Sequence, residues 1–207
     1  MTKQKTLPLI PTIFIFCLLA VAAPSLDARA EDYNEAVYLE RNDTYYELVR
    51  AETAFPDFNF PNLRYAISWE SARELARTRY HNGRRGRLAV IDAEDIHTLL
   101  KEHYELDELA WIGLRYWCKY SKGTWEDGTK YSHTAFKVWA PLWNQDGTKA
   151  SKTGKGRRPN CTSYLNYWPV HYWPKAKKDE YSPGAFKWNA NGTYKHAKAF
   201  FIEYPPN

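Results

Sequence analysis

The hydrophobic period of this 207-residue chain changes once, near Leu109, and this change limits the folds that it can adopt. Before Leu109, apolar residues recur at spacings of three and four, as on one face of a helix. After it, short apolar runs are separated by turn signals, as in antiparallel strands. The resulting order of strand, helix, strand, helix and then several strands predicts an α+β domain.

Two helices are expected in the front half of the chain. Ser68 is a good N-cap residue, and the apolar residues after it share one helical face as far as Asn82-Gly83. Asp92 is expected to cap the second helix, with His97 at its surface. The predicted buried stripe of this second helix comprises Ile96, Leu99, Leu100 and His103.

Strands and two long irregular stretches make up the rest of the prediction. Asp127-Gly128 is a two-residue hairpin signal between two short β-type runs. The stretches 132–160 and 168–183 show no regular period, and stretches of such length in a domain are usually functional loops. The predicted strands are 44–49, 88–91, 109–116, 161–167, 186–189 and 197–204.

The first thirty residues have the pattern of a secretory signal peptide. A basic start precedes the apolar run 7–23, and Ala28-Arg29-Ala30 has an A-x-A spacing, so we expect cleavage before Glu31. The alternative is an uncleaved anchor, because the run is close to the lower limit of about 17 residues for crossing a bilayer. Export would place the protein in the periplasm, at the cell surface or outside the cell. The expected parts are a signal peptide at 1–30, a lead-in segment at 31–43 and one domain at 44–207.

Composition excludes several classes of protein. With 9 Trp, 16 Tyr and 9 Phe, the chain has enough ring surface to fold rather than remain disordered. The formal net charge of +5 becomes smaller when the leader is removed, which does not suggest a nucleic-acid partner. Cys118 and Cys161 remain after cleavage, and they either form a disulfide in an oxidising compartment or stay as two buried thiols.

The sequence contains no recognised catalytic motif. G-x-S-x-G, H-E-x-x-H and a phosphate-binding loop are all missing. Glu126 and Asp127 are adjacent carboxylates, but a hairpin turn should point them outward or in opposite directions, which does not suit an acid–base pair. We therefore expect a protein that binds rather than catalyses. An oxidoreductase that uses Cys118 and Cys161 is the minor alternative.

Seven short motifs give the chain a resemblance to a known family. They occur at 68–72, 86–94, 111–114, 123–128, 136–139, 186–189 and 200–204. In this order and spacing they resemble the C-type lectin-like domain, in the cysteine-poor form that is common in bacteria. The Trp-Ile-Gly-Leu run at 111–114 is the most recognisable of them. The resemblance implies two helices packed on small antiparallel sheets, with a long irregular loop region that binds the ligand.

Sugar-binding members of that family hold a calcium ion in the long loop, and this sequence departs from their pattern. Their Glu-Pro-Asn or Gln-Pro-Asp motif is missing from the equivalent stretch 139–146. Ala190 follows Trp188-Asn189 where the family has an aspartate. Calcium takes about six to eight oxygen ligands, so the remaining donors make a poor cage. We expect no metal or other cofactor, with a degenerate calcium site as the alternative.

The candidate ligand-binding residues lie in or beside the two irregular stretches. Aromatic faces stack on sugars and anchor protein interfaces, although such rings also close loops onto a core. A basic run could contact an anionic partner, and the alternative is a solvated loop. The candidates are Trp143, Asn144, Asp146, Trp168, Trp188 and Asn189 for the ligand, and Lys152, Lys155, Arg157 and Arg158 for an anionic partner.

These observations together predict an exported protein that recognises a carbohydrate, such as an anionic glycan, without the usual calcium site. The alternative is an adhesion or protein-interaction module that binds a host or envelope protein.

Overall fold

The computed structural model describes residues 35–54, 66–117, 120, 122–131, 136–140, 143, 167–174, 186–190 and 196–207. All of them belong to one unit, residues 32–207. The predicted signal peptide and the residues Cys118, Asn144, Asp146, Lys152, Lys155, Arg157, Arg158 and Cys161 lie outside the described residues.

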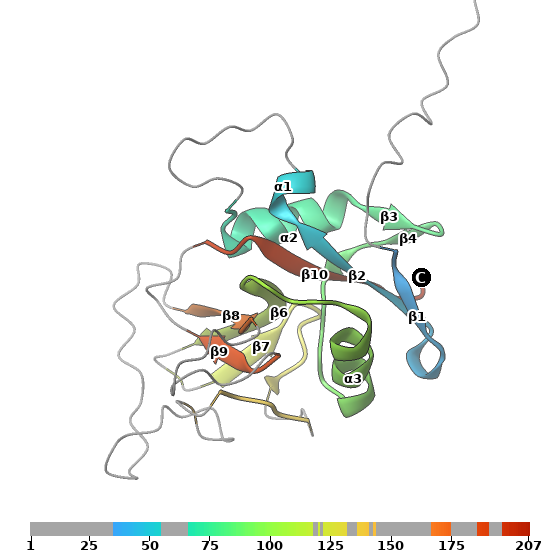
Figure 1. The fold of residues 1–207 in the computed structure, drawn as a ribbon. Helices are drawn as coiled ribbons and strands as arrows, with labels where there is room; N and C mark the ends of the chain where they lie inside the picture. Colours follow the sequence, from blue (N-terminus) through green and yellow to red (C-terminus); the bar gives the residue numbers. More distant parts are fainter. Residues whose placement is uncertain are drawn as a thin grey trace, which may run out of the picture. The chain divides into compact units, whose positions relative to one another are not determined.

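One eight-stranded sheet contains strands from both the N-terminal and the C-terminal parts of the domain (Figure 1). The last strand of the chain, β10, lies inside the sheet, antiparallel to β2 and parallel to β6. The order along the sheet is β1 (Val37–Leu39), β2 (Thr44–Arg50), β10 (Ala199–Tyr204), β6 (Ala110–Trp117), β8 (Trp168–Tyr172) and β9 (Trp188–Ala190). In addition, β5 (Arg87–Leu88) pairs with β10, and β7 (Lys122–Trp125) pairs with β6.

Two ten-residue helices accompany the sheet, which confirms the α+β prediction. They are α2 (Trp69–Thr78) and α3 (Glu94–His103), and a single turn, α1 (Ala51–Ala54), follows β2. As predicted, Ser68 caps α2, because its hydroxyl oxygen accepts the backbone N–H of Ser71 at 3.1 Å. No helix among the described residues is long and apolar enough to cross a membrane.

The ends of the helices differ from prediction in two places. α2 ends at Thr78, and Asn82-Gly83 instead forms the turn between β3 (Tyr80–His81) and β4 (Arg84–Arg85). Both turn residues have positive φ, 48° and 76°, which suits a tight hairpin.

The N-terminus of α3 is set by other residues than expected. Its N-cap is Ala93 rather than Asp92, and Asp95 accepts the backbone N–H of Ile96 at 2.8 Å. The buried stripe of α3 contains Ile96 and Leu100, whereas Leu99 is partly exposed and His103 is exposed.

Three strand predictions also need correction. Residues 168–172, expected to be irregular, form the buried strand β8, and the predicted strand 161–166 lies outside the described residues. Part of the expected lead-in forms β1, which pairs with β2. Residues 89–91 are buried as predicted but belong to no strand. The carbonyl of Ala89 instead accepts the backbone N–H of Gly113 at 2.8 Å.

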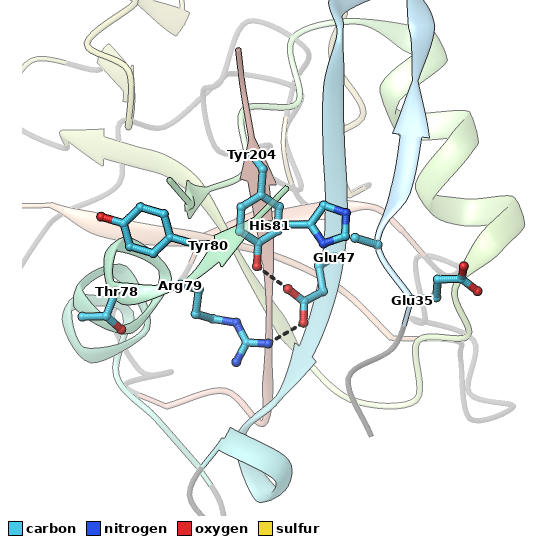
Figure 2. A pocket seen from close by; sticks show the side chains of 8 residues that line it. Glu35, Glu47, Thr78, Arg79, Tyr80, His81 and Tyr204 are labelled. Carbon is cyan, nitrogen blue, oxygen red and sulfur yellow. Dashed lines mark hydrogen bonds and ion pairs between the residues drawn. The ribbon is translucent and has the colours of Figure 1, made fainter. Parts of the chain in front are cut away.

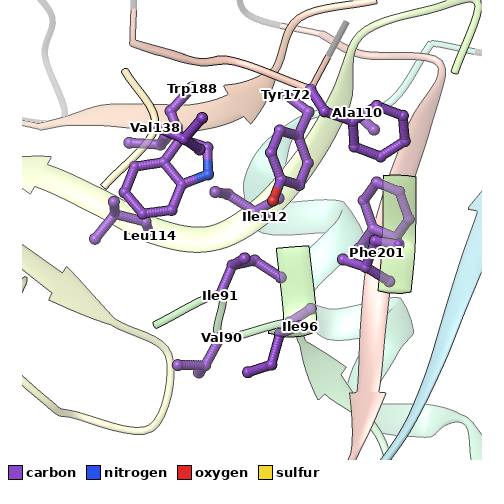
Figure 3. Packing of buried hydrophobic residues seen from close by; sticks show 14 of the residues in the cluster. Val90, Ile91, Ile96, Ala110, Ile112, Leu114, Val138, Tyr172, Trp188 and Phe201 are labelled. Carbon is purple, nitrogen blue, oxygen red and sulfur yellow. The ribbon is translucent and has the colours of Figure 1, made fainter. Parts of the chain in front are cut away.

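The core has two parts, and β6 contributes side chains to both because successive side chains of a strand point to opposite faces of the sheet. Trp111 packs with α2 residues such as Trp69 and Ala72. Ile112 and Leu114 belong to the larger cluster, which contains residues of α3, β8 and β9 and extends to the aromatic side chains of the predicted loop region. Figure 3 shows part of this larger cluster, with Ile112 near Tyr172 and above Ile91. The larger cluster therefore supports the region where the ligand loops were predicted.

Candidate functional site

The predicted long loop leaves the sheet along β9. The backbone N–H of Trp188 donates to the carbonyl of Val138, and that of Ala140 donates to the carbonyl of Trp188, both at 2.8 Å. Trp143 then donates its backbone N–H to the carbonyl of Ala140 at 2.8 Å. Val138 and Ala140 are thus hydrogen-bonded to β9, and Trp143, the last described residue before the segment 144–166, is hydrogen-bonded to Ala140.

Four tryptophan rings lie where this segment begins and ends, and we call them the loop floor: Trp139, Trp143, Trp168 and Trp188. The rings of Trp139 and Trp143 are stacked, with centroids 4.7 Å apart. Trp143 meets Trp168 edge to face at 6.3 Å, and Trp139 meets Trp188 edge to face at 5.8 Å. The floor is therefore a packed aromatic layer at the base of the loop.

Three of these rings were predicted to contact the ligand, and all three are buried. Trp143 is 3% exposed, Trp168 is 8% exposed and Trp188 is not exposed. The structure thus places them as the alternative described them, as rings that close the loops onto the core. Direct contact between any of them and a ligand stays a prediction. Because these rings are buried, substituting any of these tryptophans should lower the stability of the fold, so a loss of binding in such a variant would not by itself show contact with the ligand.

The side chain of Asn189 is occupied inside the protein. Its Oδ1 accepts the indole N–H of Trp143 at 3.0 Å, and its Nδ2 lies 3.4 Å from Nε2 of His171. His171 is fully buried, and burial lowers its pKa to about 3, so the imidazole is neutral and its Nε2 can accept this N–H. Asn189 therefore fastens β9 to β8 and to the loop floor.

This arrangement does not fit a calcium site of the kind that the family resemblance implies. Calcium needs several carboxylate and amide oxygens that are free to coordinate it. The oxygen of Asn189 faces an indole N–H, and Ala190 offers no side-chain oxygen. Among the described residues, no group of three His, Cys, Asp or Glu could hold a metal ion.

The segments 144–166 and 175–185, which contain most of the two predicted irregular stretches, begin and end at the same part of the sheet. The segment 144–166 begins after Trp143 and ends before β8, whose first residue packs on Trp143. The segment 175–185 begins after a pair of hydrogen bonds that joins Trp173 to the β9 side. These are Trp173 N–H to the Lys187 carbonyl at 2.8 Å and Phe186 N–H to the Trp173 carbonyl at 3.0 Å. Their ends are thus held by one rigid base.

Away from the loop floor, a hollow of about 400 Å³ lies between β2, the end of α2 and the end of β10 (Figure 2). Arg79 and Tyr204 both point at the carboxylate of Glu47. A guanidinium N–H of Arg79 donates to Oε1 at 2.6 Å, and the Tyr204 hydroxyl donates to Oε2. Sequence reasoning missed this group, although a glutamate inside the apolar run 44–49 was a signal for it. Because both Glu47 oxygens accept internal donors, the group ties three elements together.

Glu126 was predicted to face outward or away from Asp127, but its side chain is only 1% exposed. Arg73 Nε and an N–H of Arg77 each approach its Oε1 at 2.7 Å. Asp127 is exposed and accepts the backbone N–H of Thr129 at 2.8 Å, as a turn residue does. Glu126 therefore joins the hairpin to α2, a role that only its distant partners reveal.

No protein-family model matches the sequence, and no curated protein matches it. Solved structures do match. The cow C-type carbohydrate-recognition domain of CD23, determined in the presence of a GlcNAc2Man3 oligosaccharide, is 15% identical. The match covers 83% of this chain and 94% of that one, with a TM-score of 0.50. The mouse scavenger receptor C-type lectin domain is 16% identical over 83% and 94% of the two chains, with a TM-score of 0.48. Identities this low concern the fold alone.

Proposed function

Because this chain has the C-type lectin-like fold, we propose that it is an exported protein that binds a carbohydrate through the segments 144–166 and 175–185. A fold hosts many functions, so the fold alone does not identify a ligand. The proposal therefore rests on what this chain places at the loop region.

The loop floor is the observation that carries the proposal. Its stacked rings and the Trp143–Asn189–His171 contacts make a rigid base, from which both irregular segments start and to which both return. Binding residues are commonly carried on loops that a rigid scaffold positions. A rigid base under two segments that contain most of the predicted irregular stretches supports a ligand surface formed by those segments.

The composition of the two segments favours an anionic glycan. Lys152, Lys155, Arg157 and Arg158 form a basic run without an intervening acid, and Lys175, Lys177 and Lys178 add charge in the second segment. Guanidinium and ammonium groups bind carboxylate and sulfate groups by charge-assisted hydrogen bonds. Asn144 and Asp146 offer polar oxygens for sugar hydroxyls. Since the Asn189 amide is already occupied, the proposed binding does not use calcium.

A glycan array of neutral and acidic sugars, read with and without a chelator, tests the proposal. We expect binding to acidic glycans that the chelator leaves unchanged. Replacing Lys152, Lys155, Arg157 and Arg158 together by Gln, which we call the loop variant, should weaken binding at least about tenfold, or about 1.4 kcal/mol. The control, matched in charge, carries Lys101→Gln, Arg41→Gln, Arg85→Gln and Lys198→Gln, which replace four exposed cations outside the two loop segments.

Each contrary result has a defined meaning. Loss of binding on chelation would show that a calcium site exists and that the assignment of Asn189 is wrong. If no glycan binds but the protein captures a purified envelope or host protein through the same loops, the protein-interaction alternative replaces the carbohydrate. Equal binding by the loop variant and the control would remove the basic run from the site.

Export is a separable part of the proposal. We expect the protein recovered from its source to begin at Glu31 and to carry a disulfide between Cys118 and Cys161, since an oxidising compartment favours it. Mass spectrometry of the intact protein, before and after reduction, measures both. A mass that includes the first thirty residues would indicate the uncleaved anchor instead.

A further inference from the structure

A second surface, away from the loop floor, is formed by the outer face of the β6–β7 hairpin. Residues pair directly as Arg115 with Thr124 and as Trp117 with Lys122. Side chains of directly opposite residues share one face of a sheet, so these four lie together. We call them, with the neighbouring Tyr167, the Arg115 face.

Helix α2 covers only part of this side of the sheet. Its first residue, Trp69, lies with its ring centroid 6.0 Å from that of Tyr167, and Tyr167 lies 5.0 Å from Trp117. Beyond Trp69, both Tyr167 and Trp117 are partly exposed, and Lys122 is exposed. A shallow hollow of about 410 Å³ is lined by Trp117, Tyr120, Lys122 and Thr124. Half-exposed rings therefore border a depression on the surface.

Arg115 carries a positive charge and forms no ion pair with a carboxylate of any residue that the structure describes. Its guanidinium carbon lies 5.3, 5.6 and 5.9 Å from the ring centroids of Trp69, Trp117 and Tyr167. Its Nε is buried and has no hydrogen-bond acceptor in the described part of the chain. Four arginines on or near α2 do have carboxylate partners: Arg73, Arg77, Arg79 and Arg87.

Two further charged residues, Glu70 and Lys122, lie at or beside this face, and neither compensates the charge of Arg115 through an ion pair that the structure describes. Glu70, the carboxylate beside this face, accepts the hydroxyl of Tyr167. Lys122 forms no ion pair with any residue that the structure describes. The guanidinium of Arg115 and the ammonium group of Lys122 therefore lie beside the partly exposed rings of Trp117 and Tyr167. Such a surface attracts a molecule that combines an anionic group with a flat, partly apolar face.

We propose that the Arg115 face is a second binding site, for an acidic saccharide. The carboxylate or sulfate of the sugar lies between Arg115 and Lys122, and the C–H face of its ring stacks on Trp117. The hydroxyl of Thr124 is placed to bond a sugar hydroxyl. The site shares no residue with the loop floor or the two loop segments, so it stands whether or not those loops bind a ligand.

Calorimetric titration of the whole protein tests this site with three probes: oligogalacturonate for carboxylate, dextran sulfate for sulfate, and neutral dextran. We expect binding of at least one acidic probe and none of neutral dextran. When they are added to the loop variant, Lys122→Glu and Arg115→Gln should each weaken the remaining binding at least about tenfold, while Lys101→Glu, an equal charge change on α3, leaves it unchanged. Since Lys122 is exposed, its variant should keep the melting temperature, so a folding defect in Arg115→Gln would not mask the result.

The loop variant separates the two proposed sites. If the loop variant loses all binding of the acidic probes, and the Arg115-face variants bind these probes as the parent does, this inference is wrong and the proposed function stands. If it retains part of the binding, and that part disappears with Lys122→Glu, the second site is supported. Equal losses in Lys122→Glu and Lys101→Glu, or no binding of either acidic probe, would overturn the second site.

Discussion

His97 shows how packing alone sets the state of one side chain. Sequence analysis placed it at the surface, but its ring lies 5.0 Å from that of Phe136, and its Nδ1 lies 2.9 Å from the Tyr172 hydroxyl. Burial, and to a lesser extent the charges of Lys187 and Lys101, lower the pKa of His97 to about 4. Nδ1 of the neutral imidazole accepts a hydrogen bond from the Tyr172 hydroxyl, because burial raises the pKa of that phenol and keeps it protonated.

We expect His97 to make the protein sensitive to acid. The unfolded chain takes up this proton near pH 6.5 and the folded chain only near pH 4. The stabilisation present above pH 6.5 is therefore lost as pH falls through that window. His97→Phe should reduce the loss of unfolding free energy between pH 7 and 4.5 by about 2 kcal/mol. Urea denaturation at the two pH values measures it, and parallel profiles for both proteins would contradict it.

Gly113 illustrates a close approach of two backbones. A Cβ at this position would lie 2.6 Å from the carbonyl oxygen of Leu88 and 2.9 Å from that of Ala89, both backbone atoms. We expect Gly113→Ala to destabilise the protein by about 2 kcal/mol, because neither strand can move without losing hydrogen bonds. Gly83→Ala is the control: it has open space and costs only its positive φ, about 1 kcal/mol. Equal urea midpoints for the two variants would refute the steric argument.

At the scale of elements, a single carboxylate, that of Glu126, holds α2 to the hairpin that turns at Asp127-Gly128. Glu126 is nearly inaccessible, and it holds Arg73 and Arg77, which are partly exposed. Removing one member of a buried ion pair leaves the others without compensation, and this costs more than the pair itself contributes. The hairpin therefore depends on the helix for its position.

Glu126→Gln should lower the unfolding free energy by about 2 kcal/mol. Glu74→Gln is the matched control, because Glu74 also pairs with Arg73 and Arg77 but is 65% exposed, and it should change stability by less than about 0.5 kcal/mol. Chemical denaturation of both variants measures the difference. Similar small effects would mean that solvent screens the Glu126 pairs as well.

For the whole molecule, β10 joins distant parts of the chain by pairing with β2, β5 and β6. The rings of the loop floor pack on one another and on β8 and β9, and these contacts close the sheet at its β8–β9 end. The folded domain and the proposed ligand loops should therefore be separable.

Replacing 145–158 by a short Gly-Ser linker tests that separation. The variant should unfold cooperatively, with an unfolding free energy within about 1 kcal/mol of the parent, since loop length alters closure entropy only slowly. Binding of acidic glycans to the loops should be lost. Circular dichroism during heating and the glycan array measure the two properties, and a broad, non-cooperative transition would show that the segment is part of the core.

The sequence by itself determined the features that depend on a few neighbouring residues. Examples are the cap at Ser68, the Asp127-Gly128 turn, the strand at 44–49 and the ordered motifs that identified the fold. The backbone preferences of such short segments are local, so a pattern of a few residues is enough to predict them.

Only the tertiary structure decided which side chains face the core. The strand β8 was missed because it is buried along its whole length and contains Pro169 and His171, so it lacks the alternation of a half-exposed strand. Glu126 turned inward because two arginines about fifty residues earlier meet it. The sequence predicts Trp143 and Trp168 as ligand contacts, yet both are buried and their rings meet edge to face. Burial is a property of neighbours that lie far apart in the chain, and no local pattern contains it.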